Sequence, residues 1–128
     1  MSILDEDPTP GGTLTLQTLA MPKDTNPNGD VFAGWLMAQM DISGGIMARE
    51  IAKGRVTTVA VGSMVFLRPV PVGATISCYA QELEVGRSSI RTLVEVWLRD
   101  SIKGVVEKVT EGEFVFVAID DNGRTRSI

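Results

Sequence analysis

The stretch Gly34–Lys53 decides the fold, and it reads GWLMAQMDISGGIMAREIAK. Its apolar side chains recur at spacings of three, four and seven residues, which is the period of one face of an α-helix. The positions that recur in this way are Leu36, Met37, Met40, Ile46, Met47 and Ile51. Gly54 follows the stretch, and Arg49 and Lys53 lie in its last turns, as is usual at a helix C-terminus. We therefore predict one helix, roughly 30 Å long.

The rest of the chain predicts strands, from alternating Leu and Thr near the N-terminus and from later runs rich in Val and Thr. The predicted strands are Thr13–Leu19, Val56–Leu67, Ala74–Val85, Ser88–Leu98 and Val105–Ile119. Short connections join the last four, which favours antiparallel neighbours. One helix covering one face of a curved antiparallel sheet of about five strands is an α+β domain. Residues 1–12 are acidic and then rich in Pro and Gly, so we predict a flexible leader before a single domain over residues 13–128.

The overall composition is that of an ordinary globular domain. The chain has 128 residues, a net charge of -4 and 44% apolar residues. A net negative charge argues against non-specific nucleic-acid binding, which needs a basic face. The acidic N-terminus does not have the pattern of a signal peptide, and no apolar run is long enough to cross a bilayer. We therefore predict a cytoplasmic protein with neither a nucleic acid nor a membrane as partner.

The chain contains no histidine and one cysteine. The lack of histidine excludes Ser-His-Asp and Cys-His triads and any His-ligated zinc site. If the chain is an enzyme, a carboxylate, Lys, Tyr or bound water must move its protons. Cys78 lies in an apolar strand pattern, so we predict a buried structural residue rather than a nucleophile. No metal site is predicted.

Asp41 lies in a stripe of small residues on the predicted helix. Its neighbours at three, four and seven residues are Met37, Ala38, Gly44, Gly45, Gly34 and Ala48. Two adjacent glycines inside a helix cost about 1 kcal/mol each relative to Ala, so something should compensate. One interpretation is close packing of the helix against the sheet or another helix, which the stripe alone favours slightly. The other is a groove in which a ligand lies beside Asp41.

The loop before the helix, Asn26–Asp30, reads NPNGD. The N–H groups at a helix start carry partial positive charge and suit an oxyanion or a phosphate. For the loop alone, a capping turn made by Asn28 or Asp30 is the simpler interpretation. Loop and stripe together place N–H groups, an amide and a carboxylate within two helical turns, because Gly34 and Asp41 are roughly 10 Å apart along the axis. Such a set can polarise a carbonyl and attack it directly or through water.

The segment Asp24–Asp41, DTNPNGDVFAGWLMAQMD, resembles the signature of hotdog-fold acyl-CoA thioesterases, most closely the YciA-like subfamily. Later segments also fit that family: Gly54–Val59, Phe66–Val70, Val85–Ser89 and Val94–Trp97. The resemblance implies a long central helix wrapped by an antiparallel sheet. It also implies a homodimer whose sheets join edge to edge, with YciA-like members forming trimers of dimers. One departure is Ala33, where many relatives have Gly.

The resemblance also implies a reaction, the hydrolysis of acyl-CoA to a free fatty acid and CoA, at a site between two protomers. Asp41 corresponds to the acidic residue of the family and would act as general base or as nucleophile. Asn26, from the other chain, would orient water or the thioester. Helix N–H groups near Gly34 would be the oxyanion donors. No cofactor is expected, because coenzyme A is part of substrate and product.

Coenzyme A carries phosphates, so an acidic protein needs local cations to bind it. Arg87 with Ser88 and Ser89 is the first candidate, and Arg68 and Arg55 are the second choices. Arg124 and Arg126, near the C-terminus, are weaker candidates.

Three other functions compete with hydrolysis. An acyl-CoA-binding sensor of the same fold would hold the ligand without hydrolysing it. Hotdog dehydratases and hydratases rely on a histidine, which this chain lacks. A purely structural oligomer would leave the adjacent glycines and the Asn-rich loop unexplained.

Overall fold

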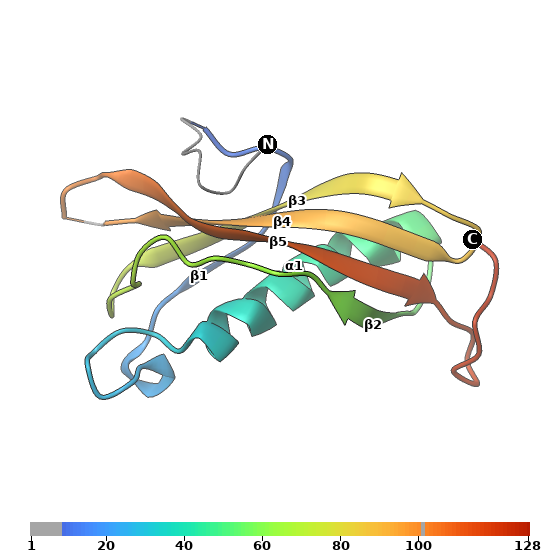
Figure 1. The fold of residues 1–128 in the computed structure, drawn as a ribbon, viewed down its shortest axis with the longest axis horizontal. Helices are drawn as coiled ribbons and strands as arrows, with labels where there is room; N and C mark the ends of the chain where they lie inside the picture. The colour runs from blue at the N-terminus through green and yellow to red at the C-terminus, as the bar shows by residue number, and fades with distance from the viewer. Residues whose placement is uncertain (1–8, 101) are drawn as a thin grey trace.

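The computed structural model describes residues 9–100 and 102–128, which form one helix packed on one sheet (Figure 1). The elements in chain order are β1 (Thr13–Leu19), a 3₁₀ turn (Pro22–Asp24), α1 (Ala33–Ala52), β2 (Val56–Val61), β3 (Thr75–Val85), β4 (Ser89–Arg99) and β5 (Val106–Ala118). The predicted helix is confirmed, and each predicted strand overlaps one observed strand. Residues 1–8 of the predicted leader lie outside the described residues, so its flexibility stays a prediction.

The sheet has the strand order β1-β3-β4-β5-β2, and all neighbouring strands are antiparallel. Helix α1 runs across one face of this sheet and contacts every strand (Figure 1). Alternate side chains of β4, among them Ile90, Val94 and Val96, are fully buried in the core beneath the helix. The predicted α+β arrangement, one long helix against a five-stranded antiparallel sheet, is therefore confirmed.

The buried face of α1 follows the helical period, with Leu36, Met40, Ser43, Gly44, Ala48 and Ala52 facing the sheet. The helix ends at Ala52, and Lys53 makes the C-cap in the left-handed conformation, with φ of 56°. The guanidinium of Arg126 donates to the carbonyl of Ala52 at 2.6 Å and so caps this end of the helix. No helix in the described part of the chain is both long and apolar enough to span a bilayer.

Gly44 is the point of closest approach between helix and sheet. A Cβ built on Gly44 would lie 3.0 Å from Oγ1 of Thr92 and 3.1 Å from the ring of Phe116. We therefore expect Gly44→Val to lower the free energy of unfolding by about 1–3 kcal/mol through overpacking. Gly45→Ala is the matched control, because its Cβ would lie 3.7 Å from the same ring, and better helix propensity should raise stability by up to about 1 kcal/mol. Urea unfolding measures both; equal stability of the two variants would contradict the packing role of Gly44.

Two expectations about the segment after α1 are wrong. The predicted strand Val56–Leu67 ends at Val61, and residues 62–71 run on as an irregular extended segment. Pro69 and Pro71 lack the N–H that a sheet ladder needs. This segment makes only isolated bonds, such as Leu67 N–H to the Val109 carbonyl at 2.7 Å. It is long enough to cross the sheet, so β2 pairs with β5 instead of with β3, its neighbour in sequence.

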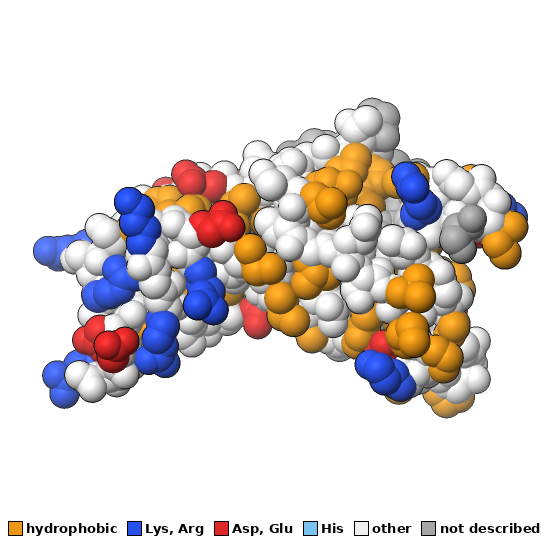
Figure 2. All heavy atoms as spheres, turned by 180° about the vertical axis from the view of Figure 1, so that it is seen from behind, with side chains coloured by type: hydrophobic (Ala, Val, Ile, Leu, Met, Phe, Trp, Pro, Cys, Tyr) orange, Lys and Arg blue, Asp and Glu red, His pale blue; other side chains and the backbone are white. Residues whose placement is uncertain are grey.

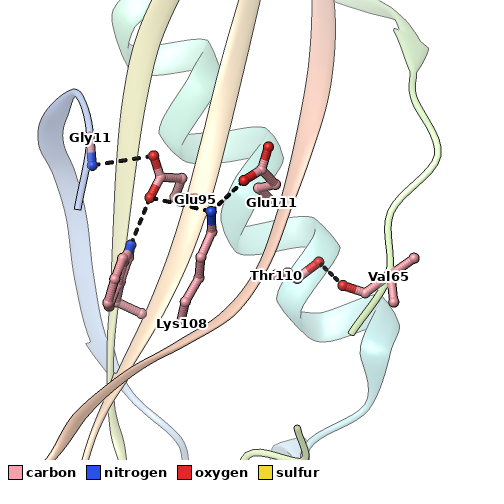
Figure 3. A network of polar contacts seen from close by, with 7 residues as sticks. Gly11, Val65, Glu95, Lys108, Thr110 and Glu111 are labelled. Carbon is pink, nitrogen blue, oxygen red and sulfur yellow. Dashed lines mark hydrogen bonds and ion pairs between the residues drawn. The ribbon is translucent and has the colours of Figure 1, made fainter. Parts of the chain in front are cut away.

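A buried ionic network lies on the sheet face opposite α1 (Figure 3). Glu95 accepts from Trp97 Nε1 at 2.9 Å and from the backbone N–H of Gly11 at 3.2 Å. Lys108 is almost fully buried; it lies 3.9 Å from Glu95 and also pairs with Glu111. Because buried charges must be paired, the network fixes the chain just before β1 against β4 and β5.

Candidate active site

Asp41 lies on α1 beside a groove that is open to solvent in the single chain. The groove has a volume of about 260 Å³, and its lining residues come from α1, β2 and β5: Asp41, Ile42, Gly45, Ile46, Arg49, Val56, Thr58 and Phe116. Oγ1 of Thr58 donates to Oδ1 of Asp41 at 2.6 Å, which fixes the orientation of the carboxylate. Only one carboxylate oxygen is used by this bond, so the other is available to a ligand in the groove.

The adjacent glycines of α1 have different environments. Gly44 is buried and touches the sheet, as the packing interpretation of the stripe predicts. Gly45 lines the groove beside Asp41, as the ligand interpretation predicts. The two interpretations that the sequence leaves open therefore apply to neighbouring residues.

The start of α1 carries N–H groups without a backbone acceptor. The N-cap is Phe32, whose side chain makes no capping bond, so the expectation that Asn28 or Asp30 caps the helix is wrong. The carbonyl of Phe32 instead accepts hydrogen bonds from the backbone N–H groups of Trp35 and Leu36. Gly34 is exposed, and a Cβ built on it would meet no atom within 4 Å. Within residues 9–100 and 102–128, Gly34 therefore has no packing role, and its N–H makes no hydrogen bond.

Asn26 organises the loop before the helix. Its Oδ1 accepts from the N–H groups of Asn28 at 2.9 Å and of Asp30 at 3.2 Å. Its backbone N–H donates to the Asp30 carbonyl at 2.7 Å, which closes the turn. These bonds occupy Oδ1 and leave the Nδ2 donor for other contacts. Neither Asn26 nor Gly34 is among the described residues that line the Asp41 groove.

The predicted cationic residues fall into two groups. Arg87 is exposed in the turn between β3 and β4, and Ser88 and Ser89 accept through their carbonyls from Ala118 and Gly86. Arg55 donates weakly to the carbonyls of Asp121 and Asp120 in the loop after β5, at 3.3 and 3.4 Å. Arg68 instead pairs with Glu107 at 2.8 Å, so its charge is partly neutralised within the chain.

Several basic segments meet at the end of the molecule where α1 stops. Backbone hydrogen bonds join Ile119 to Arg55, Ala118 to Ser88 and Ile128 to Arg87. Figure 2 shows Lys and Arg side chains gathered at this end, while apolar side chains dominate the other. Arg55, Arg87 and the end of α1 therefore share one basic end, consistent with an anionic ligand there.

Sequence reasoning missed the two other polar residues that line the groove, Thr58 and Arg49. Arg49 follows Asp41 by eight residues and so lies on the same helix face, a spacing that could have identified it. No comparable signal exists for Thr58, because the sheet order decides which strand lies beside the middle of α1.

Comparison with known proteins decides the family. The family model described as Thioesterase superfamily matches residues 28–105. The acyl-CoA thioester hydrolase YciA of Salmonella typhimurium is 52% identical over 95% of this chain and 94% of its own length. The chain belongs to the YciA-like acyl-CoA thioester hydrolases of the thioesterase superfamily.

Solved structures of two thioesterases share the fold. A hexameric broad specificity acyl-coenzyme A thioesterase is 54% identical, with a TM-score of 0.90 over 94% of this chain and 83% of that one. A hexameric hotdog fold thioesterase of Campylobacter jejuni is 39% identical, with a TM-score of 0.85 over 91% of this chain and 90% of that one. The expected hotdog fold is therefore confirmed.

Cys78, the single cysteine of this thioesterase, is fully buried on β3, as predicted from its strand pattern. Burial raises the pKa of the thiol to about 12, well above the roughly 8.5 of a free cysteine. Because only the thiolate reacts, we expect no labelling of the native protein by an aromatic disulfide reagent at about pH 8. The denatured chain should release one equivalent of chromophore. Rapid stoichiometric labelling of the native protein would contradict this burial.

Proposed function

We propose that the chain hydrolyses acyl-CoA thioesters to a free carboxylate and coenzyme A. The observation that carries the proposal is the Asp41 carboxylate, held by Thr58 beside an open groove, in a chain without histidine. The substrate assignment is supported by the YciA relative, an acyl-CoA thioester hydrolase. The proposed chemistry needs no cofactor, because coenzyme A enters as part of the substrate.

Asp41 supplies the base or the nucleophile. As a base, its free oxygen takes a proton from water as that water attacks the thioester carbonyl. As a nucleophile, it attacks the carbonyl itself and expels the CoA thiolate, and water then hydrolyses the mixed anhydride. In both routes the Thr58 hydroxyl holds the carboxylate in one orientation.

The thioester carbonyl is bound at the start of α1. The exposed N–H near Gly34 donates to the oxygen as negative charge develops on it, and one such donor typically contributes about 10²–10³ in rate. Asn26 orients the attacking water or the thioester through Nδ2, because loop bonds occupy its Oδ1. The Cβ of Ala33 lies beside this approach.

One complete site requires two chains. Asp41 lies in the groove, whereas Asn26 and Gly34 are not among the residues that line it. β2 forms the end of the sheet beside the groove, so one of its backbone edges has no partner strand within the described chain. Val59 and Val61 on this strand are exposed apolar residues that a second copy would cover.

We propose at least a homodimer joined edge to edge at β2, with Asn26 and Asp41 of each site coming from different chains. A trimer of such dimers agrees with the hexameric state of the structural relatives. Neither a nucleic acid nor a membrane is expected as a partner, and the cytoplasmic location stays a prediction.

The CoA phosphates bind at the basic end. Arg87 with Ser88 and Ser89 remains the first candidate, because its guanidinium is exposed on a short turn. Arg55 is the second, since its contacts to loop carbonyls are long and exposed. Arg68 is a weaker choice because its ion pair with Glu107 would have to rearrange.

Hydrolysis measured over acyl-CoA chain lengths with a thiol reagent tests the function. Release of CoA at a saturable rate is the expected result. The buried Cys78 contributes no background signal to this assay. Tight binding of acyl-CoA without release from any chain length would instead support the sensor of the same fold.

A further inference from the structure

The groove continues from Asp41 along α1 to a cationic side chain. Asp41, Gly45 and Arg49 are spaced by four residues, so they lie on one helix face, and all three line the groove. Eight residues of helix place Arg49 about 12 Å beyond Asp41 along the axis. Gly45 leaves the path between them without a side chain, and Val56 and Thr58 of β2 border it.

The guanidinium of Arg49 is available to a ligand. The side chain is exposed, and within residues 9–100 and 102–128 it makes no hydrogen bond or ion pair. Its backbone carbonyl accepts from the N–H groups of Lys53 and Gly54, so the helix end fixes the position of the backbone. The groove therefore has a carboxylate at one end and, at the other, a cation that has no partner among the described residues and lies in the last turn of α1.

We propose that Arg49 binds an anionic group of the substrate while Asp41 acts on the thioester, an inference that rests on the proposed function. A guanidinium binds phosphate and carboxylate oxygens equally well in a bidentate geometry. The anion is therefore either a phosphate of coenzyme A or a terminal carboxylate on the acyl group. In either case Arg49 positions the substrate and does not take part in the bond-breaking step.

Arg49→Gln tests the assignment through the split between KM and kcat. We expect KM for butyryl-CoA or for succinyl-CoA to rise about three- to tenfold with kcat nearly unchanged, the size expected for a partly exposed charge pair. The rise should shrink at high salt, because screening weakens exposed pairs. Arg99→Gln is the matched control, since Arg99 is an exposed arginine at the end of β4 and its loss changes the net charge equally.

Two substrate comparisons identify the anion. A KM rise on butyryl-CoA that is absent on butyryl-pantetheine, which lacks the phosphates, assigns Arg49 to a phosphate. A rise on succinyl-CoA that is absent on butyryl-CoA assigns it to an acyl carboxylate. An unchanged KM for every substrate, an equal rise on butyryl-pantetheine, or an equal effect of Arg99→Gln would overturn the proposal.

The proposed function and the role of Arg49 can fail separately. If the wild-type protein releases no CoA from any thioester, the proposed hydrolysis is wrong. Calorimetric titration with butyryl-CoA and with succinyl-CoA then tests Arg49 alone. Weaker binding of either ligand by Arg49→Gln than by Arg99→Gln supports the anion contact, and equal binding of both overturns it.

Discussion

Asp41→Asn is expected to lower kcat at least about 10²-fold, because an amide neither accepts the proton of water nor attacks the thioester. The fold should be unaffected. Asp41 is only partly buried at the groove, and the amide oxygen of Asn can still accept the Thr58 hydroxyl. Steady-state hydrolysis of butyryl-CoA measures the loss, and the midpoint of urea unfolding shows whether the variant is intact.

Thr58→Val is the companion variant for this experiment. It removes the hydroxyl that donates to Asp41 at 2.6 Å but keeps the branched shape and the carboxylate. Its loss of kcat should be smaller than that of Asp41→Asn, because the base remains while only its orientation is weakened. Turnover of Asp41→Asn at the wild-type rate would rule out Asp41 as base and as nucleophile.

Mixing two inactive variants is expected to restore hydrolysis. If Asn26 and Asp41 of each site come from different chains, a mixed dimer of Asn26→Ala and Asp41→Ala contains one intact site and one doubly altered site. A two-fold interface builds each site from Asn26 of one chain and Asp41 of the other. After random exchange between equal amounts of the two variants, both residues are therefore wild type in about a quarter of all sites. Activity should therefore rise from near zero toward a quarter of the wild-type value.

The mixture needs a control for chain exchange. The two variants are unfolded together in urea and refolded, and mass spectrometry of the native assembly shows whether mixed oligomers form. Mixed oligomers without any recovered activity would place Asn26 and Asp41 of one site on the same chain. A stable, fully active monomer of the wild-type protein would contradict the shared site as well.

The fold was largely predictable because its signals are local. The helix from Ala33 to Ala52 can be predicted because apolar side chains recur at helical spacing over about twenty consecutive residues. The predicted strand Val56–Leu67 is too long, because the apolar residues Met64–Leu67 continue the strand pattern past Gly62 while the pairing with β5 stops at Val61. The place of β2 at the edge of the sheet does not follow from the sequence, because nothing in residues 62–71 shows that they cross the sheet instead of turning back beside β2.

The sequence alone determined that any base must be a residue other than histidine, and it indicated one carboxylate as a candidate. A chain without histidine must use another base, and Asp41 is the acidic residue in the small-residue stripe of the only long helix predicted from the sequence. Those are properties of composition and of neighbouring residues, so no tertiary contact is needed to find them.

Only the tertiary structure decided what surrounds Asp41. It placed Thr58 on the carboxylate, assigned Gly44 to the sheet and Gly45 to the groove, and put Arg49 at the far end of that groove. It also paired Arg68 with Glu107, thirty-nine positions away. These contacts depend on which strands become neighbours, and the order of a sheet is set by packing over the whole domain rather than by the period of any one segment.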